Sequence, residues 1–155
     1  MPNATPHDAD IILKLYDLRR EPEMRKARNF YAGQFWPNNL ADVERVLFDT
    51  SKPEQAWFRQ VLSYWDMAVC LVLNGALNEQ LFLDTQGEAF FVYAKIKPFV
   101  AEYRAKYNQP EFMGNIEKLI QRSPGAQKKA ATFDERVKWV KERITAAQHA
   151  AAGKN

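Results

Sequence analysis

The stretch WDMAVCLVLNGALNEQLFLD, residues 65–84, is the most apolar part of this chain. Its uninterrupted apolar run covers only residues 67–73, whereas a membrane-spanning helix needs roughly 20 apolar residues. From residue 58 onward, apolar residues recur at the three- and four-residue spacing that is typical of one wide helical face. They are Phe58, Val61, Leu62, Trp65, Val69 and Val72. The stretch therefore predicts a long, buried amphipathic helix rather than a membrane span.

Both ends of this helix carry sequence signals. Ser51 stands in position to cap its start, ahead of a proline in the first turn and a glutamate at the capping-box position. Gly75 follows the last apolar residues and suits the left-handed conformation that ends many helices. The sequence therefore predicts one continuous helix over residues 53–74.

A second long helix is predicted over residues 88–107, because apolar residues recur there at helical spacing as well. Pro98 lies inside it, and an internal proline removes a backbone hydrogen bond and clashes with the preceding turn. We therefore expect a kink or a break near Lys97. The two long helices, joined by a short helix after Gly75, are expected to form an antiparallel hairpin at the centre of the fold.

The rest of the chain predicts shorter helices and a separate C-terminal element. Helices are expected over residues 9–20, 23–35, 41–48 and 110–122. Residues 123–131 contain the best candidate linker, and Thr132 then opens a second capping box. The expected organisation is a helical bundle domain over residues 1–122, the linker, and over residues 132–155 a helix with a frayed tail that packs on the same domain or on a partner chain.

The expected fold class is all-α, with one domain of seven or eight helices around the hairpin. A chain of 155 residues is long enough to bury one sizeable core. Few runs alternate apolar and polar residues, so a β fold is poorly supported. Besides the six residues of the first helix, the expected core includes Phe91, Val100, Ile116 and Leu119.

Composition places the chain among ordinary soluble proteins. Hydrophobic residues make up 46% and charged residues 26%, and the net charge is +3. This small charge does not by itself imply a nucleic-acid partner. Cys70 is the only cysteine, which fits a reducing compartment. Because the first ten residues are polar and lack the features of a signal peptide, we expect a cytoplasmic protein without a transmembrane segment.

The order of residues from about 57 to 119 has a recognisable pattern. An aromatic-rich helix runs into LVLNGALNEQLF, residues 71–82, and then into KPFVAEYRAKYNQPEF, residues 97–112. This order resembles a family of small helical bacterial proteins of unknown function, some of which are attached to a membrane helix. The resemblance implies a helical fold and brings no activity, and the chain departs from the membrane-attached members by lacking an N-terminal spanning segment.

Catalytic, metal and nucleotide motifs are missing from the sequence. Nucleophilic catalysis needs a nucleophile with a base within hydrogen-bond reach. The two histidines, His7 and His149, lie far apart without a neighbouring nucleophile or a second metal ligand at helical spacing. No glycine-rich phosphate loop is present. We therefore expect no catalytic histidine, no metal and no cofactor.

Asp66 is the most informative carboxylate, because it lies beside the apolar face of the first long helix. An unpaired buried carboxylate costs several kcal/mol, so Asp66 should be exposed or paired. Arg104 on the second long helix is the candidate partner. Together they form a candidate polar pocket. The alternatives are a structural ion pair, or a carboxylate that simply lies at the edge of the helix face.

Two groups of basic residues form a candidate anion-binding surface. Lysines and arginines neutralise phosphates on nucleic acid or lipid, although a solvated helix face has the same composition. Few aromatic residues lie among them, so stacking on single-stranded bases is not indicated. The candidate residues are Arg19, Arg20, Arg25, Lys26, Arg28, Lys138 and Lys141.

The C-terminal helix carries a candidate interface. Its apolar stripe contains Phe133, Val137, Val140 and Ile144, and Trp139 lies off that stripe. The stripe docks either on its own bundle or on a second copy, and tryptophan is favoured as an interface anchor.

The leading functional hypothesis is a non-enzymatic helical protein-interaction module that self-associates through this helix. The first alternative is an electrostatic binder of nucleic acid or an anionic membrane surface. The second is a small-ligand pocket protein or an enzyme with its site around Asp66.

Overall fold

The computed structural model describes residues 3–153, and within them it contains eight α-helices, one π-helical segment and no strand. The expected all-α fold is therefore confirmed. Residues 1–2, at the start of the expected bundle domain, and residues 154–155, at the end of the expected C-terminal tail, lie outside the described residues. The elements are α1 (Pro6–Arg20), α2 (Pro22–Asn29), η1 (Phe30–Gln34), α3 (Leu40–Phe48), α4 (Pro53–Leu73), α5 (Glu79–Thr85), α6 (Glu88–Tyr107), α7 (Gly114–Arg122) and α8 (Pro124–Ala152).

The quoted apolar stretch forms the second half of α4 and ends as expected. Gly75 has a φ of 72°, and the backbone amide of Ala76 donates to the carbonyl of Leu71 at 2.9 Å, which closes the helix with a left-handed turn. The expected serine cap is wrong. Lys52 is at the N-cap position without a side-chain hydrogen bond, because the hydroxyl and amide of Ser51 donate instead to the carboxylate of Asp49.

The core follows the predicted helical faces closely. Nine of the ten expected core residues are buried, and Phe91 is half-buried. The buried cluster also includes aromatic residues from outside the two long helices, such as Tyr31, Phe35 and Phe82. These residues come from η1, the position directly after it and α5, so the core is built from most of the chain rather than from the two long helices alone.

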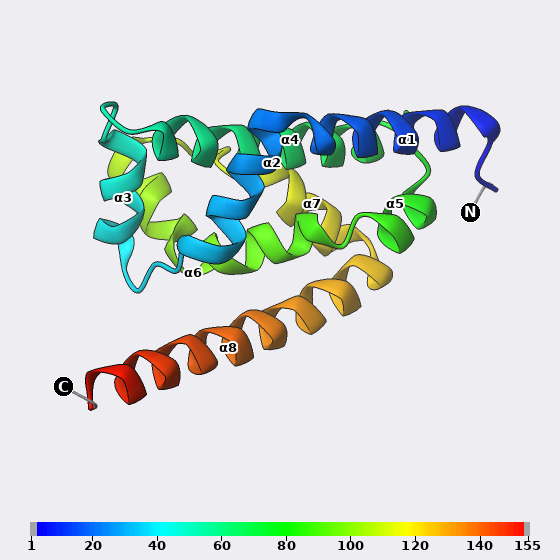
Figure 1. The fold of residues 1–155 in the computed structure, drawn as a ribbon. Helices are drawn as coiled ribbons and strands as arrows, with labels where there is room; N and C mark the ends of the chain where they lie inside the picture. Colours follow the sequence, from blue (N-terminus) through cyan, green and yellow to red (C-terminus); the bar gives the residue numbers. More distant parts are fainter. Residues whose placement is uncertain (1–2, 154–155) are drawn as a thin grey trace.

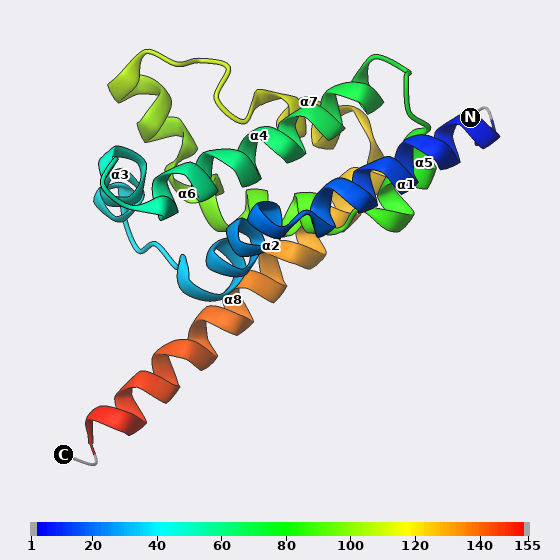
Figure 2. The same ribbon diagram turned by 45° about the horizontal axis from the view of Figure 1, so that its top comes forward.

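The two long helices are not each other's main neighbours. The closest neighbours of α4 are α2 and α7, whereas α6 packs mainly against α8. Figure 1 shows α4 along one side of the bundle and α6 along the opposite side. Helix α6 continues through Pro98, and its last turns bend toward α3 (Figures 1 and 2). The expected hairpin is therefore not confirmed as the centre of the fold.

The expected linker and second capping box are wrong, because residues 124–152 form the single long helix α8. Ser123 caps it by accepting a hydrogen bond from the amide of Ala126 at 3.2 Å, and Pro124 occupies its first position. A Cβ atom at Gly125 would lie 2.9 Å from Leu83 Cδ1, so this glycine serves close packing rather than a flexible link. The residues that follow, including three alanines, favour helix.

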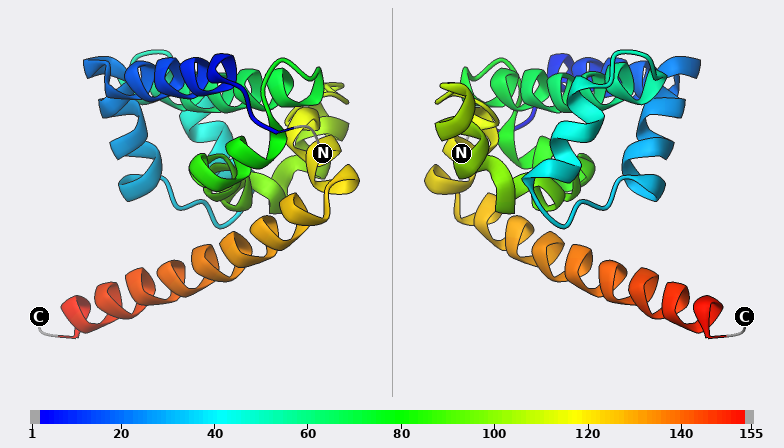
Figure 3. Two further views of the ribbon diagram at one scale, coloured as in Figure 1. Left: turned by 90° about the vertical axis from the view of Figure 1, so that its right-hand side faces the viewer. Right: turned by 90° about the vertical axis from the view of Figure 1, so that its left-hand side faces the viewer.

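The first half of helix α8 packs on the bundle of its own chain. Its contacts are with α5, α6 and α7. The C-terminal turns leave the bundle and project away from it, as Figures 1 to 3 show. No helix among residues 3–153 combines the length and the apolar character needed to cross a membrane.

Candidate functional site

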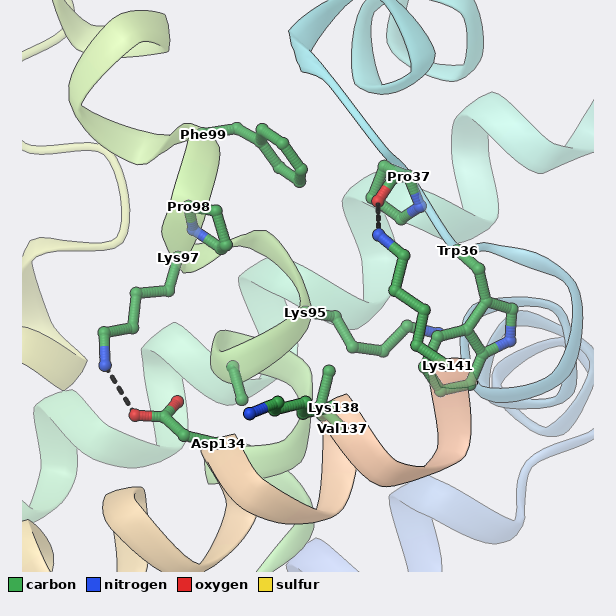
Figure 4. Close-up of a pocket in the computed structure, with 11 residues that line it drawn as sticks. Trp36, Pro37, Lys95, Lys97, Pro98, Phe99, Asp134, Val137, Lys138 and Lys141 are labelled. Atoms are coloured by element: carbon green, nitrogen blue, oxygen red, sulfur yellow. Dashed lines mark hydrogen bonds and ion pairs between the residues drawn. The ribbon is translucent and has the colours of Figure 1, made fainter. Parts of the chain in front are cut away.

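A cleft of about 510 Å³ lies between α6, α8 and the segment that follows η1. Four lysines line it: Lys95 and Lys97 from α6, and Lys138 and Lys141 from α8. Figure 4 shows that these side chains come from two sides of the cleft, with Trp36 and Pro37 closing its end. The volume falls in the range of small-molecule sites.

Lys95 is buried in the wall of this cleft, with only 4% of its surface exposed. Its ammonium nitrogen donates a hydrogen bond to the carbonyl oxygen of Tyr31. Tyr31 lies in the π-helical segment at the end of α2, close to the point where the helix ends and carbonyls lose their helical partners. The Tyr31 hydroxyl in turn donates to the carbonyl of Val92 at 2.8 Å, so two bonds fasten η1 to α6.

Four aromatic rings surround the Lys95 nitrogen. The distance from Nζ to the ring centroid is 3.7 Å for Trp36, 5.1 Å for Tyr31, 5.4 Å for Phe91 and 5.8 Å for Phe35. Rings at this range attract a cation through their quadrupoles. They also exclude water from the amine.

The charge of Lys95 is poorly compensated. Across residues 3–153, no carboxylate lies within ion-pair distance of its nitrogen. Burial, with a smaller contribution from the charge of Lys141, lowers the pKa of Lys95 to about 7. The aromatic rings and the Tyr31 carbonyl act in the opposite direction, because both favour the protonated amine. Burial thus favours the neutral amine, whereas the rings and the carbonyl favour its charged form.

The other lysines differ from Lys95 in their partners. Lys97 pairs with Asp134 at 2.6 Å, and the Lys141 nitrogen donates to the carbonyl oxygen of Pro37 at 2.7 Å. Lys138 is exposed and has no carboxylate partner in the described part of the chain. With one aspartate against four lysines and with apolar walls that include Phe99 and Val137, the cleft suits an anion that carries an apolar portion.

The expected anion-binding residues divide into two groups. Lys138 and Lys141 line the cleft, so the structure brings them together with Lys95. The N-terminal group lies elsewhere and is largely paired, since Arg28 binds Glu88 at 2.6 Å and Arg19 lies 3.7 Å from the same carboxylate. Lys26 pairs with Glu23, and Arg25 donates to the carbonyl of Arg20.

The expected contact between Asp66 and Arg104 is wrong. Arg104 binds Glu117 at 2.8 Å and also donates to the carbonyl of Phe112, while Asp66 accepts a hydrogen bond from Asn115 at 2.9 Å. The reason is that α7 and the segment before it supply nearer partners to both side chains.

Asp66 nevertheless lines a second groove, of about 590 Å³, together with residues of α3 and α4 and of the segment before α7. The second oxygen of its carboxylate, Oδ1, is buried and has no hydrogen-bond partner among the described residues. Arg104 does not line this groove, so only Asp66 of the two residues expected in the polar pocket is found there.

The expected interface residues of α8 have different environments. Phe133 packs beside Gly87, and Val137 lines the cleft, so both dock on their own chain. Val140 and Ile144 are half-buried. Trp139 is 55% exposed, and the guanidinium of Arg143 lies 4.5 Å from its ring centroid.

Sequence reasoning missed Lys95 and Trp36. The available signal was a lysine within the apolar run from Ala89 to Ile96, at a position on the buried side of α6. A lysine on a helix is usually exposed, and the segment that carries Trp36 gave no sign of where it would pack. No group of residues suited to holding a metal ion occurs among residues 3–153.

Comparisons with known proteins bear on the family alone. No curated protein and no solved structure matches the chain. The profile of a family described as a domain of unknown function, DUF4760, matches residues 4–123. The matched region includes Trp36, Lys95 and Lys97, and it ends where α8 begins. Because the match covers well over half of the 155 residues, the chain belongs to the DUF4760 family.

Proposed function

We propose that this protein is a helical binding module that holds a small anionic ligand with an apolar portion in the lysine-lined cleft. The observation that carries the proposal is the placement of Lys95, Lys138 and Lys141 around one cavity with aromatic and aliphatic walls. Clefts of this size that combine apolar walls with convergent polar groups are typical ligand sites. The perturbed charge state of Lys95 supports a functional cleft, since such groups cluster at functional sites.

The environment of the basic residues favours a small ligand over nucleic acid or a membrane surface. Arg19 and Arg28 are committed to Glu88, which reduces the basic surface open to an extended polyanion. Lys95, Lys138 and Lys141, which form no ion pair with a carboxylate among the described residues, line one cleft rather than a broad face.

A series of three six-carbon probes tests this proposal: hexanoate, 1-hexanol and hexylammonium. Because the cleft is basic, hexanoate should raise the melting temperature, and the increase should fall as salt rises. Replacing both Lys138 and Lys141 by Gln should remove most of the effect. Lys128→Gln is the matched control, because Lys128 is an exposed lysine of the same helix that does not line the cleft. An equal response to hexanoate and 1-hexanol would contradict the proposal.

A second candidate function is self-association of two copies through the projecting part of α8. The observation that favours it is the exposure of Trp139 on a helix that leaves the bundle (Figure 3). We expect light scattering on the full chain to give the mass of a dimer, and Trp139→Ala to give a monomer with an unchanged melting temperature. Arg136→Ala, which changes another exposed residue of α8, is the control. A monomeric wild type would exclude this candidate.

A further inference from the structure

Lys95 differs from the other cleft lysines in a chemically useful way. Lys97 is neutralised by Asp134, and Lys141 is held by the Pro37 carbonyl. Lys95 has a carbonyl acceptor and aromatic neighbours, and no carboxylate in the described chain pairs with it. A desolvated lysine beside another cation is the usual setting of an amine that attacks carbonyl carbon.

The amine must be unprotonated to act as a nucleophile. Burial lowers the pKa of Lys95 to about 7, so much more of this amine is neutral near pH 7 than of an ordinary lysine. An exposed lysine, with a pKa near 10.4, is neutral in only about one molecule in a few thousand. The Tyr31 carbonyl accepts one N–H and so fixes the direction of the amine in the wall of the cleft.

We propose that Lys95 forms an imine with a small aldehyde or 2-oxo acid whose anionic group is held by Lys138 and Lys141. This inference rests on the proposed anion-binding function of the same cleft and adds the chemical class of its ligand. Both holding lysines line the same cavity as Lys95, so a ligand in the cleft meets the amine and two further cations along its walls.

The step balances without a further reagent. The nitrogen lone pair adds to the carbonyl carbon, the carbonyl electron pair moves to oxygen, and a proton passes from nitrogen to that oxygen to give a carbinolamine. The carbinolamine then loses its hydroxyl group and the remaining N–H proton as water, which leaves the C=N bond. The Trp36 ring, 3.7 Å from Nζ, covers the amine and must turn aside as the carbonyl enters.

Reductive trapping tests the proposal on the full chain. Glyoxylate is added at pH 7 with sodium cyanoborohydride, so that each trapped imine becomes a carboxymethyl group that peptide mass spectrometry assigns to one lysine. We expect Lys95 to be modified at least about tenfold faster than Lys97 or Lys128, because its amine is far less protonated. Propionaldehyde, a neutral aldehyde of similar size, should modify Lys95 more slowly than glyoxylate does.

The variants separate this inference from the proposed function. Lys95→Arg keeps a positive charge but forms no stable imine, so this variant should lose the fast labelling and show only the slow labelling of its exposed lysines. The control variant Lys128→Arg should keep the fast labelling of Lys95. Oxalate, an unreactive dianion, reports anion binding by calorimetry. Oxalate binding without preferential labelling of Lys95 overturns the imine and leaves the proposed function standing. Equal labelling of Lys95 by glyoxylate and propionaldehyde overturns the anionic ligand class. If Lys95→Arg does not fold, the assignment of the labelled lysines by mass spectrometry in the wild-type chain still tests the proposal.

Discussion

Replacing Lys95 by Met changes how the stability of this protein depends on pH. The side chain is 4% exposed, and burial lowers the pKa of its amine from 10.5 to about 7. Methionine has a similar length and no charge, so the variant keeps most of the packing against Trp36 and Phe91. It also loses the hydrogen bond to the Tyr31 carbonyl, which favours the protonated amine and so opposes the effect of burial on the pKa.

The sign of the effect follows from proton binding. Between the folded pKa and the unfolded pKa of Lys95, the unfolded chain holds a proton on this amine that the folded chain lacks. The free energy of unfolding of the wild type therefore rises with pH through this window, by about 1.4 kcal/mol per pH unit. From about pH 7.5 to about pH 9.5 the rise from Lys95 is about 2.5 kcal/mol. The aromatic rings around the amine reduce it, because they stabilise the protonated form.

Urea unfolding followed by tryptophan fluorescence measures this difference. Both chains are unfolded at a series of pH values between about 7 and 9.5, and the wild-type free energy minus the variant free energy is plotted against pH. The difference cancels the titration of groups that the two chains share. Lys97→Met is the matched control, because Lys97 is exposed and should show no comparable slope. A flat difference for Lys95→Met would refute the account of a desolvated, uncompensated amine.

Three further substitutions test local features. Gly75→Ala places a side chain at a φ of 72° and should lower the free energy of unfolding in urea by about 1–2 kcal/mol; unchanged stability would contradict the left-handed helix end. Tyr31→Phe removes the hydroxyl that donates to Val92 and should cost about 1 kcal/mol by the same assay, since that bond is buried. Asn115→Ala leaves the Asp66 carboxylate without its amide donor, so we expect a loss of about 1–2 kcal/mol in the same urea assay, and unchanged stability would contradict a role for this bond.

Local signals in the sequence predicted the elements of this fold well. The face of α4 from Phe58 to Val72 is buried as its spacing indicates, and the chain turns at Gly75. Such features depend on residues within one or two turns of each other, so the sequence carries them directly. The same local reasoning failed at residues 123–131, where Gly125 suggested a linker. A side chain at residue 125 would clash with Leu83 of another helix, and the local sequence gives no sign of that contact.

By itself, then, the sequence determined the helical class, the long helix α4 with its buried face, and the absence of a span within it. The tertiary structure alone decided which side chains meet. The lysine cleft joins Trp36, Lys95 and Lys141, which are tens of residues apart, and no local pattern records that proximity. Only packing places the Lys95 amine among four rings and beside a second lysine, and its charge depends on those neighbours, because burial and nearby charge set the pKa.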